Sequence, residues 1–300
     1  MCRPSDPYCR KPTAPFGSLS NSLPYSPLPV PVIDRLLGRT FSAPPAHLSR
    51  VLFLPKHNSK VTHLPVYEFT DAYRQAVKDA PLGSSLYKIN MMFMSRPRGD
   101  GTDADVRFFV DVTTDKSRVA IEERSMATKQ GSTATITLPT EQQEDSVLTV
   151  PGLGVFHVRA SANLQSGTDE SGRPSAPGFR QYPALTMESS DEPGTQWNVR
   201  SEDSSSLCYF LTESSVNERG ERTQLRTHAI YHYAGSNTHH PVDHSEGVLL
   251  VPDSEDSQNQ VISVALVFLL LWHMRELDTQ QQKSSLSKLL RKLSIGKSNQ

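Results

Sequence analysis

Cysteine is scarce in this chain of 300 residues, which carries only Cys2, Cys9 and Cys208. Three thiols, none of them at the Cys-x-x-Cys spacing, supply neither a disulfide framework nor a paired set of zinc ligands. A small disulfide-stapled fold is therefore excluded. A reducing compartment is the default expectation for such a chain.

Excess charge of one sign is also missing, because 31 basic side chains stand against 32 acidic ones and the formal net charge is −1. Proteins that bind duplex DNA normally carry an overall positive charge or a basic stripe. The composition gives no such footprint. We therefore expect no nucleic acid among the partners of this protein.

Uninterrupted apolar runs are absent from the first 50 residues, where prolines break every candidate. A secretory signal needs an apolar run, so none is predicted and the protein is expected in the cytoplasm. Any contact with a membrane is then expected from the C-terminal end, as a peripheral association.

Motifs of common catalytic sites are missing as well. The sequence has neither a Gly-x-Ser-x-Gly nucleophile elbow nor a phosphate-binding loop, and Gly152-Leu153-Gly154 lacks the third glycine of a dinucleotide fingerprint. Cys208 lies in the apolar segment Leu207-Cys208-Tyr209-Phe210, which is typical of a buried and inert thiol. We predict a protein that is not an enzyme and needs no cofactor.

The first 48 residues are rich in proline and serine and predict a disordered arm, because they offer too little apolar surface to offset the entropy of ordering. Within this arm, Arg39-Thr40-Phe41-Ser42-Ala43-Pro44 places an arginine three residues before Ser42 and a proline two residues after it. That spacing resembles the phosphoserine motif bound by 14-3-3 proteins. An unmodified linker serine is the alternative, and the sequence leaves both open.

From Val51 onward, short segments alternate apolar and polar side chains, the pattern of strands with one buried face. The clearest example is Val106 to Val112, where Val106, Phe108, Val110 and Val112 share one face. A helical turn is predicted at 71–78 and a long mobile insertion at 161–178. The predicted strands are residues 51–54, 65–70, 86–94, 106–112, 118–123, 133–138, 154–160, 195–200, 207–212, 223–233 and 247–251.

Val261 to Met274 reads VISVALVFLLLWHM, which is apolar on every side when wound as a helix. Such a helix needs protein or lipid all around it. Its length would be about 21 Å, whereas a hydrocarbon core of about 30 Å calls for about 20 apolar residues. Burial in protein is therefore the main expectation. The alternative is a tail-anchored, single-pass membrane protein with a cytosolic β domain.

About ten strands with no helices between them, followed by one apolar helix, predict an antiparallel meander that closes on itself. Closure removes unpaired strand edges, and a barrel of this size is wider than its own side chains fill. The apolar helix is expected to plug it. The predicted fold class is mainly β: an antiparallel closed β-barrel over residues 49–278 with a central hydrophobic helix at 261–277.

This strand succession, closed by the apolar helix and a charged Arg275-Glu276 exit, resembles the tubby-like C-terminal superfamily, which includes the phospholipid scramblases. The resemblance covers Leu64 to Leu277. It implies a closed barrel threaded by a hydrophobic C-terminal helix. Members of this superfamily are mostly non-enzymatic, so the resemblance also implies a protein that binds phosphoinositides or acts near membranes without catalysing a reaction. No lipid-headgroup residues carry over, because the chain has no motif on which to align them.

Residues 279–300 form a basic tail with apolar positions at i, i+3, i+4 and i+7, the spacing of an amphipathic helix. Such a helix lies on anionic membranes or fills a calmodulin-type groove, and packing on the outside of the barrel is the alternative. Ser294 follows Arg291-Lys292-Leu293, a basophilic-kinase context in which phosphate would lower the positive charge. The predicted membrane-binding residues are Leu286, Leu289, Leu290 and Leu293, with Lys283, Lys288, Arg291, Lys292 and Lys297.

Histidines gather between residues 228 and 244. Imidazole ligands suit zinc or copper, which makes His239, His240 and His244 weak metal candidates. The alternative is an exposed turn broken by Pro241. His228 and His232 are expected together on the outward face of a strand. We predict no bound metal and take anionic membrane lipid as the principal partner.

Overall fold

The computed structural model describes residues 44–78, 80–82, 84–95, 105–124, 133–140, 143–163, 182–189, 195–201, 208–216, 222–234, 245–253 and 257–295. Ser42, most of the predicted insertion, and His239, His240 and His244 lie outside these residues. Within the last helix, side chains are described through Leu277 and again at Thr279.

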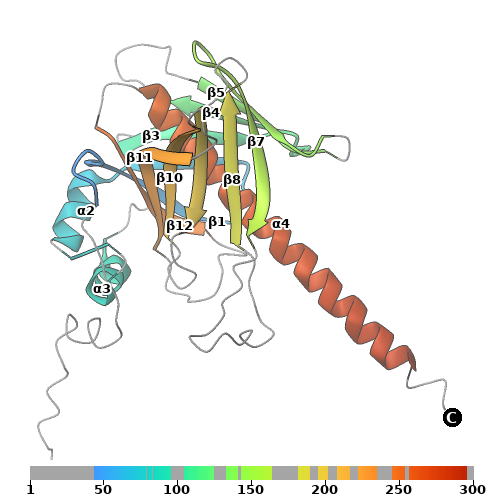
Figure 1. Ribbon diagram of the computed structural model, residues 1–300. Coiled ribbons are helices and arrows are strands. Elements are labelled where there is room, and N and C mark those ends of the chain that lie inside the picture. Colours follow the sequence, from blue (N-terminus) through green and yellow to red (C-terminus); the bar gives the residue numbers. More distant parts are fainter. Residues whose placement is uncertain are drawn as a thin grey trace, which may run out of the picture. The chain divides into compact units, whose positions relative to one another are not determined.

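Twelve antiparallel strands form one closed barrel in which each strand pairs with its neighbours in the chain and β1 pairs with β12 (Figure 1). This confirms the predicted fold class. The strands are β1 Arg50–His57, β2 His63–Glu68, β3 Val106–Val112, β4 Arg118–Glu123, β5 Thr133–Thr137, β6 Ser146–Val150, β7 Gly154–Asn163, β8 Tyr182–Ser189, β9 Thr195–Ser201, β10 Cys208–Val216, β11 Arg222–Tyr233 and β12 Ser245–Val251.

Helix α4, Ser257–Ile295, runs through the barrel, and every residue from Gln260 to Leu271 is buried. Its apolar side chains pack against the inward faces of the strands, such as Val119 and Ile121 of β4 or Leu148 of β6, and together they form the inner core. The helix contacts strands on several sides of the barrel, among them β4, β8 and β12. The strands of the same chain thus surround a helix that has no polar face to present to water.

Two short helices, α2 Thr70–Val77 and α3 Ser85–Phe93, connect β2 to β3. The predicted helical turn at 71–78 is confirmed as α2, whereas the prediction of a strand at 86–94 was wrong, because α3 occupies these residues. Ser84 caps α3 by accepting a hydrogen bond from the backbone N–H of Tyr87. Tyr87 and Met91 then repeat at the helical spacing and face the barrel wall.

A second cluster of buried residues, the outer core, lies between α2, α3 and the outside of the barrel. It contains Tyr73 and Tyr87 from the helices and Phe53, Ile230 and Leu250 from β1, β11 and β12. These strands are therefore covered on both faces. This explains why β12, SEGVLLV, is buried at all seven positions and shows no alternation in its apolar residues.

Two strands, β6 and β8, were not predicted from the sequence. β8 has Pro183 at its second position, and proline argues against a strand unless it sits at an edge or a strand start. β6 is only five residues long, SVLTV, and its inward positions include the buried Ser146. A polar residue on the inner face breaks the alternation on which the prediction depended.

Candidate functional site

The described side chains include polar clusters at the ends of the barrel, buried histidines and an exposed apolar surface. The polar clusters mark the places where α4 passes the barrel rim, and they fix how the helix is held.

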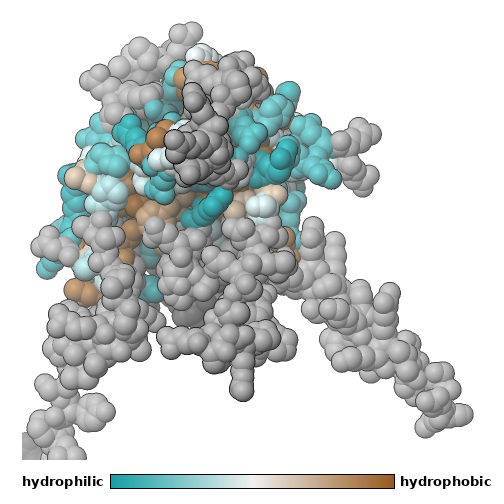
Figure 2. Space-filling model, viewed as in Figure 1, coloured by the Kyte–Doolittle hydropathy of each residue, from teal (hydrophilic) through white to brown (hydrophobic). Residues whose placement is uncertain are grey.

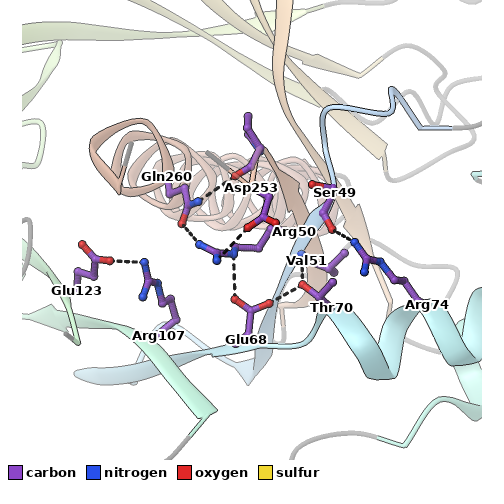
Figure 3. Close-up of polar contacts among 11 residues, drawn as sticks. Ser49, Arg50, Val51, Glu68, Thr70, Arg74, Arg107, Glu123, Asp253 and Gln260 are labelled. Carbon is purple, nitrogen blue, oxygen red and sulfur yellow. Dashed lines mark hydrogen bonds and ion pairs between the residues drawn. The ribbon is translucent and has the colours of Figure 1, made fainter. Parts of the chain in front are cut away.

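At the end where α4 begins, Arg50 of β1 lies at the centre of a polar network (Figure 3). Its Nε is 3.2 Å from a Glu68 carboxylate oxygen and its Nη2 is 3.0 Å from Asp253. Its Nη1 donates to the side-chain oxygen of Gln260 in α4 at 3.3 Å. One guanidinium therefore joins β1, the end of β2, and both sides of the β12–α4 connection.

The network continues on both sides of Arg50. Thr70 donates to Glu68 at 2.5 Å and accepts from the backbone N–H of Val51 at 2.9 Å. Gln260 donates to the Pro252 carbonyl at 2.9 Å. Each nitrogen of the Arg50 guanidinium already has a protein partner, so the arrangement fastens the start of α4 to the rim and serves as a structural clasp.

At the opposite end, here called the exit end, Arg275 is 7% exposed although the sequence suggested a charged exit into solvent. Its Nη2 donates to Ser245 Oγ, at the start of β12, at 2.8 Å. Burial lowers the pKa of Arg275 to about 10, so the side chain remains protonated near neutral pH. A buried cation needs such a partner, and the pair fixes how far α4 is inserted.

The two strand histidines do not share an exposed face. The register of β11 shifts beside Ala229, and His228 stacks on Trp197 with ring centroids 4.1 Å apart. Its Nε2 lies 2.8 Å from Glu213 Oε2. Burial lowers the pKa of His228, which the nearby Glu213 carboxylate partly offsets.

His232 faces outward from the barrel but is covered by α3. Its ring meets the ring of Tyr87 edge-on, with centroids 4.8 Å apart. Burial lowers the pKa of His232 to about 3, so the ring is neutral at physiological pH. Among the described residues, no group of three or more His, Cys, Asp or Glu is placed to hold a metal ion.

The basic tail is not a separate element, because α4 continues without a break from the barrel to Ile295. Thirty-nine helical residues extend about 58 Å, whereas the stretch from Gln260 to Arg275 extends about 24 Å. About 30 Å of helix therefore follows the buried part. The predicted leucines fall within an arc of about 100° of this helix, and Ser294 belongs to its last turn. Lys297 lies outside the described residues.

One described helix segment, Ser257–Leu277, is long and apolar enough to cross a membrane by length and composition. The same segment is 83% buried within the protein over its most apolar window. Its apolar side chains already have protein partners in the inner core.

One exposed apolar surface was missed by the sequence reasoning. Leu86, Ile89, Met92 and Phe93 face away from the barrel on α3 and are called the α3 face below. Assigning residues 86–94 to a strand concealed it. The signal that would have revealed it is Ser84 as a helix cap, followed by two apolar series at helical spacing.

Comparison of the chain with protein-family models, with curated proteins and with solved structures gives no match.

Proposed function

We propose that this protein is a non-catalytic module that binds anionic phospholipid, with phosphoinositides as the favoured headgroups, at the cytoplasmic surface of a membrane. The observation that carries the proposal is the two-part character of α4. Its first half is enclosed by the barrel, and its second half continues as a helix. At the helical period, the positions of Lys288, Arg291 and Lys292 fall outside the arc that the leucines share, whereas Lys283 lies at its border. A closed barrel around an apolar helix is also the plan of the tubby-like superfamily, to which we propose this chain belongs.

The strength expected of such a tail is modest. Each basic residue near an anionic leaflet contributes about 1 kcal/mol. The five basic residues of the tail then give about 5 kcal/mol, which corresponds to a weak and reversible association. A phosphate on Ser294 would add up to two negative charges and weaken binding by about 2 kcal/mol, or about 30-fold.

A tail-anchored protein is the second candidate, and the enclosure of Val261 to Leu271 within the inner core counts against it. For this segment to cross a bilayer, the barrel would have to release the helix and expose the inward faces of its strands to water. The positive tail would also have to cross to the far side, against the usual charge bias.

Co-sedimentation with vesicles tests the proposal. The full chain should sediment with vesicles that contain phosphatidylserine or a phosphoinositide, and should remain in solution with neutral phosphatidylcholine vesicles. Removal of Ser284 to Gln300, or the substitution Ser294→Asp, should reduce sedimentation, whereas Ser294→Ala should not. Unchanged sedimentation of both the truncated chain and Ser294→Asp would refute a membrane role for the tail.

Alkaline carbonate extraction of cell membranes separates the two candidates. A peripheral protein is released into the supernatant, whereas a chain whose apolar helix spans the bilayer remains in the pellet.

A further inference from the structure

The α3 face concentrates exposed apolar side chains on a single short helix. The exposed fractions are 36% for Leu86, 40% for Ile89, 49% for Met92 and 83% for Phe93. Only three other large hydrophobic side chains of the described chain are exposed, and they are Leu153, Val155 and Leu225. Four of these seven exposed side chains lie on one helix of nine residues and form an apolar patch. Exposed apolar patches mark sites of interaction with proteins or membranes. Figure 2 shows hydrophobic side chains at the surface over α3.

The protein holds this face outward firmly. On the opposite side of α3, Tyr87 and Met91 are buried in the outer core, and the Tyr87 hydroxyl lies 3.3 Å from that of Tyr73. Asn90 also donates to the Val77 carbonyl at the end of α2. The helix therefore cannot roll to hide Met92 and Phe93 without removing Tyr87 from the core.

The charge of α3 suits an anionic lipid surface. Lys88 is its only charged side chain, and no acidic residue occurs in its nine positions, so nothing on the helix repels anionic headgroups. Lys88 is half-buried, and Lys78, which follows α2, adds an exposed cation. Helices that lie in the membrane interface present phenylalanine and leucine to the acyl chains. Helix α3 shares this apolar face, although Lys88 is its only basic residue.

Helix α3 lies at the end of the barrel from which the basic tail emerges. Its Tyr87 packs on His232, which pairs with Val248 of β12 and Cys208 of β10. These positions lie toward the exit end of the barrel, where Arg275 meets Ser245. Helix α3 and the point where α4 leaves the barrel are therefore found at the same end of the barrel (Figure 1).

We propose that the α3 face is a second membrane contact, which inserts Phe93 and Met92 shallowly into the same anionic leaflet that the basic tail binds. This inference rests on the proposed function and adds an apolar contribution to it. The tail supplies electrostatic attraction, and the α3 face supplies burial of apolar surface and fixes the orientation of the barrel at the membrane. Two weak contacts on one folded body strengthen each other, because the second binds at high effective concentration.

The test uses the double variant Met92→Ser/Phe93→Ser, which removes apolar surface without changing charge. Both side chains are exposed, so the fold should be preserved, and a thermal melt checks this. The matched control is Leu225→Ser, which removes an exposed leucine near the start of β11, toward the other end of the barrel. Binding to phosphatidylserine vesicles should fall at least tenfold in the double variant and stay within twofold in the control.

The possible outcomes separate a failure of this inference from a failure of the proposed function. If the full chain does not bind anionic vesicles at all, the proposed function fails. If it binds, loses binding on removal of Ser284 to Gln300, and keeps full binding in the double variant, the α3 face is not a membrane contact and only this inference fails. A self-association in solution that disappears in the double variant, with unchanged vesicle binding, would reassign the face to contacts between copies of the chain.

Discussion

Replacing Leu269 by alanine should lower the free energy of unfolding by about 4 kcal/mol. Leu269 is fully buried in the inner core. Loss of three carbon groups removes about 2.4 kcal/mol of transfer free energy at about 0.8 kcal/mol each. The cavity adds to this, because the diameter and tilt of a closed barrel are linked to its strand number, so the wall cannot collapse onto the gap.

Urea unfolding followed by tryptophan fluorescence measures this loss. The two tryptophans of the chain, Trp197 and Trp272, both pack against the inner core and should report its disruption. With an m value of about 3 kcal/mol/M, the midpoint should fall by about 1.3 M. Leu225→Ala, at an exposed position, is the control and should change stability by less than about 0.5 kcal/mol. A loss below about 1 kcal/mol for Leu269→Ala would mean that α4 does not fill the barrel, and the enclosure on which the proposed function depends would be wrong.

Two further predictions concern the strands that are covered on both faces. Gly247→Ala should destabilise the protein by about 1–3 kcal/mol, although alanine is usually preferred in a strand, because the new Cβ would lie 2.5 Å from a ring carbon of Tyr231. Adding Tyr231→Leu should recover part of that loss in a double-mutant cycle, and strictly additive losses would contradict the clash. His232 has a pKa lowered to about 3 by burial, below the ordinary value of about 6.5, so its contribution to stability is complete above pH 6.5 and is lost as the pH falls toward 3. The wild type should lose about 1.4 kcal/mol per pH unit from this group between pH 6 and 4, and His232→Leu should show a correspondingly flatter profile in urea titrations at each pH; identical slopes would contradict burial of a neutral ring.

The closed barrel and its helix were predictable because both follow from the pattern of apolar and polar side chains, which the hydrophobic effect converts into buried and exposed faces. Alternation in segments such as Val106 to Val112 indicates one wet and one dry face, and that strand is observed with the predicted bounds. Val261 to Met274 has no polar side that could face water, and its enclosure follows from that composition alone.

What the sequence concealed lies where a second layer covers the barrel. Once α2 and α3 pack on the outside, β12 no longer alternates, and His232 appears as an exposed polar residue although it is buried. The α3 face was lost for the same reason, since a short apolar segment between two strands resembles another strand until its cap is recognised. The clasp around Arg50 joins residues more than 200 positions apart, from β1 to α4, and no local pattern reports such a contact.

The order of the elements along the chain has a consequence for synthesis. The twelve strands are translated before the helix that fills them, and about 200 residues separate Arg50 from Ser257. At about 5–20 residues per second, the inward faces of the first strands wait roughly 10 to 40 seconds for their partner. During that interval the nascent chain exposes apolar strand faces and unpaired strand edges, which are prone to aggregate. We therefore expect chaperones to bind the nascent chain until α4 has left the ribosome.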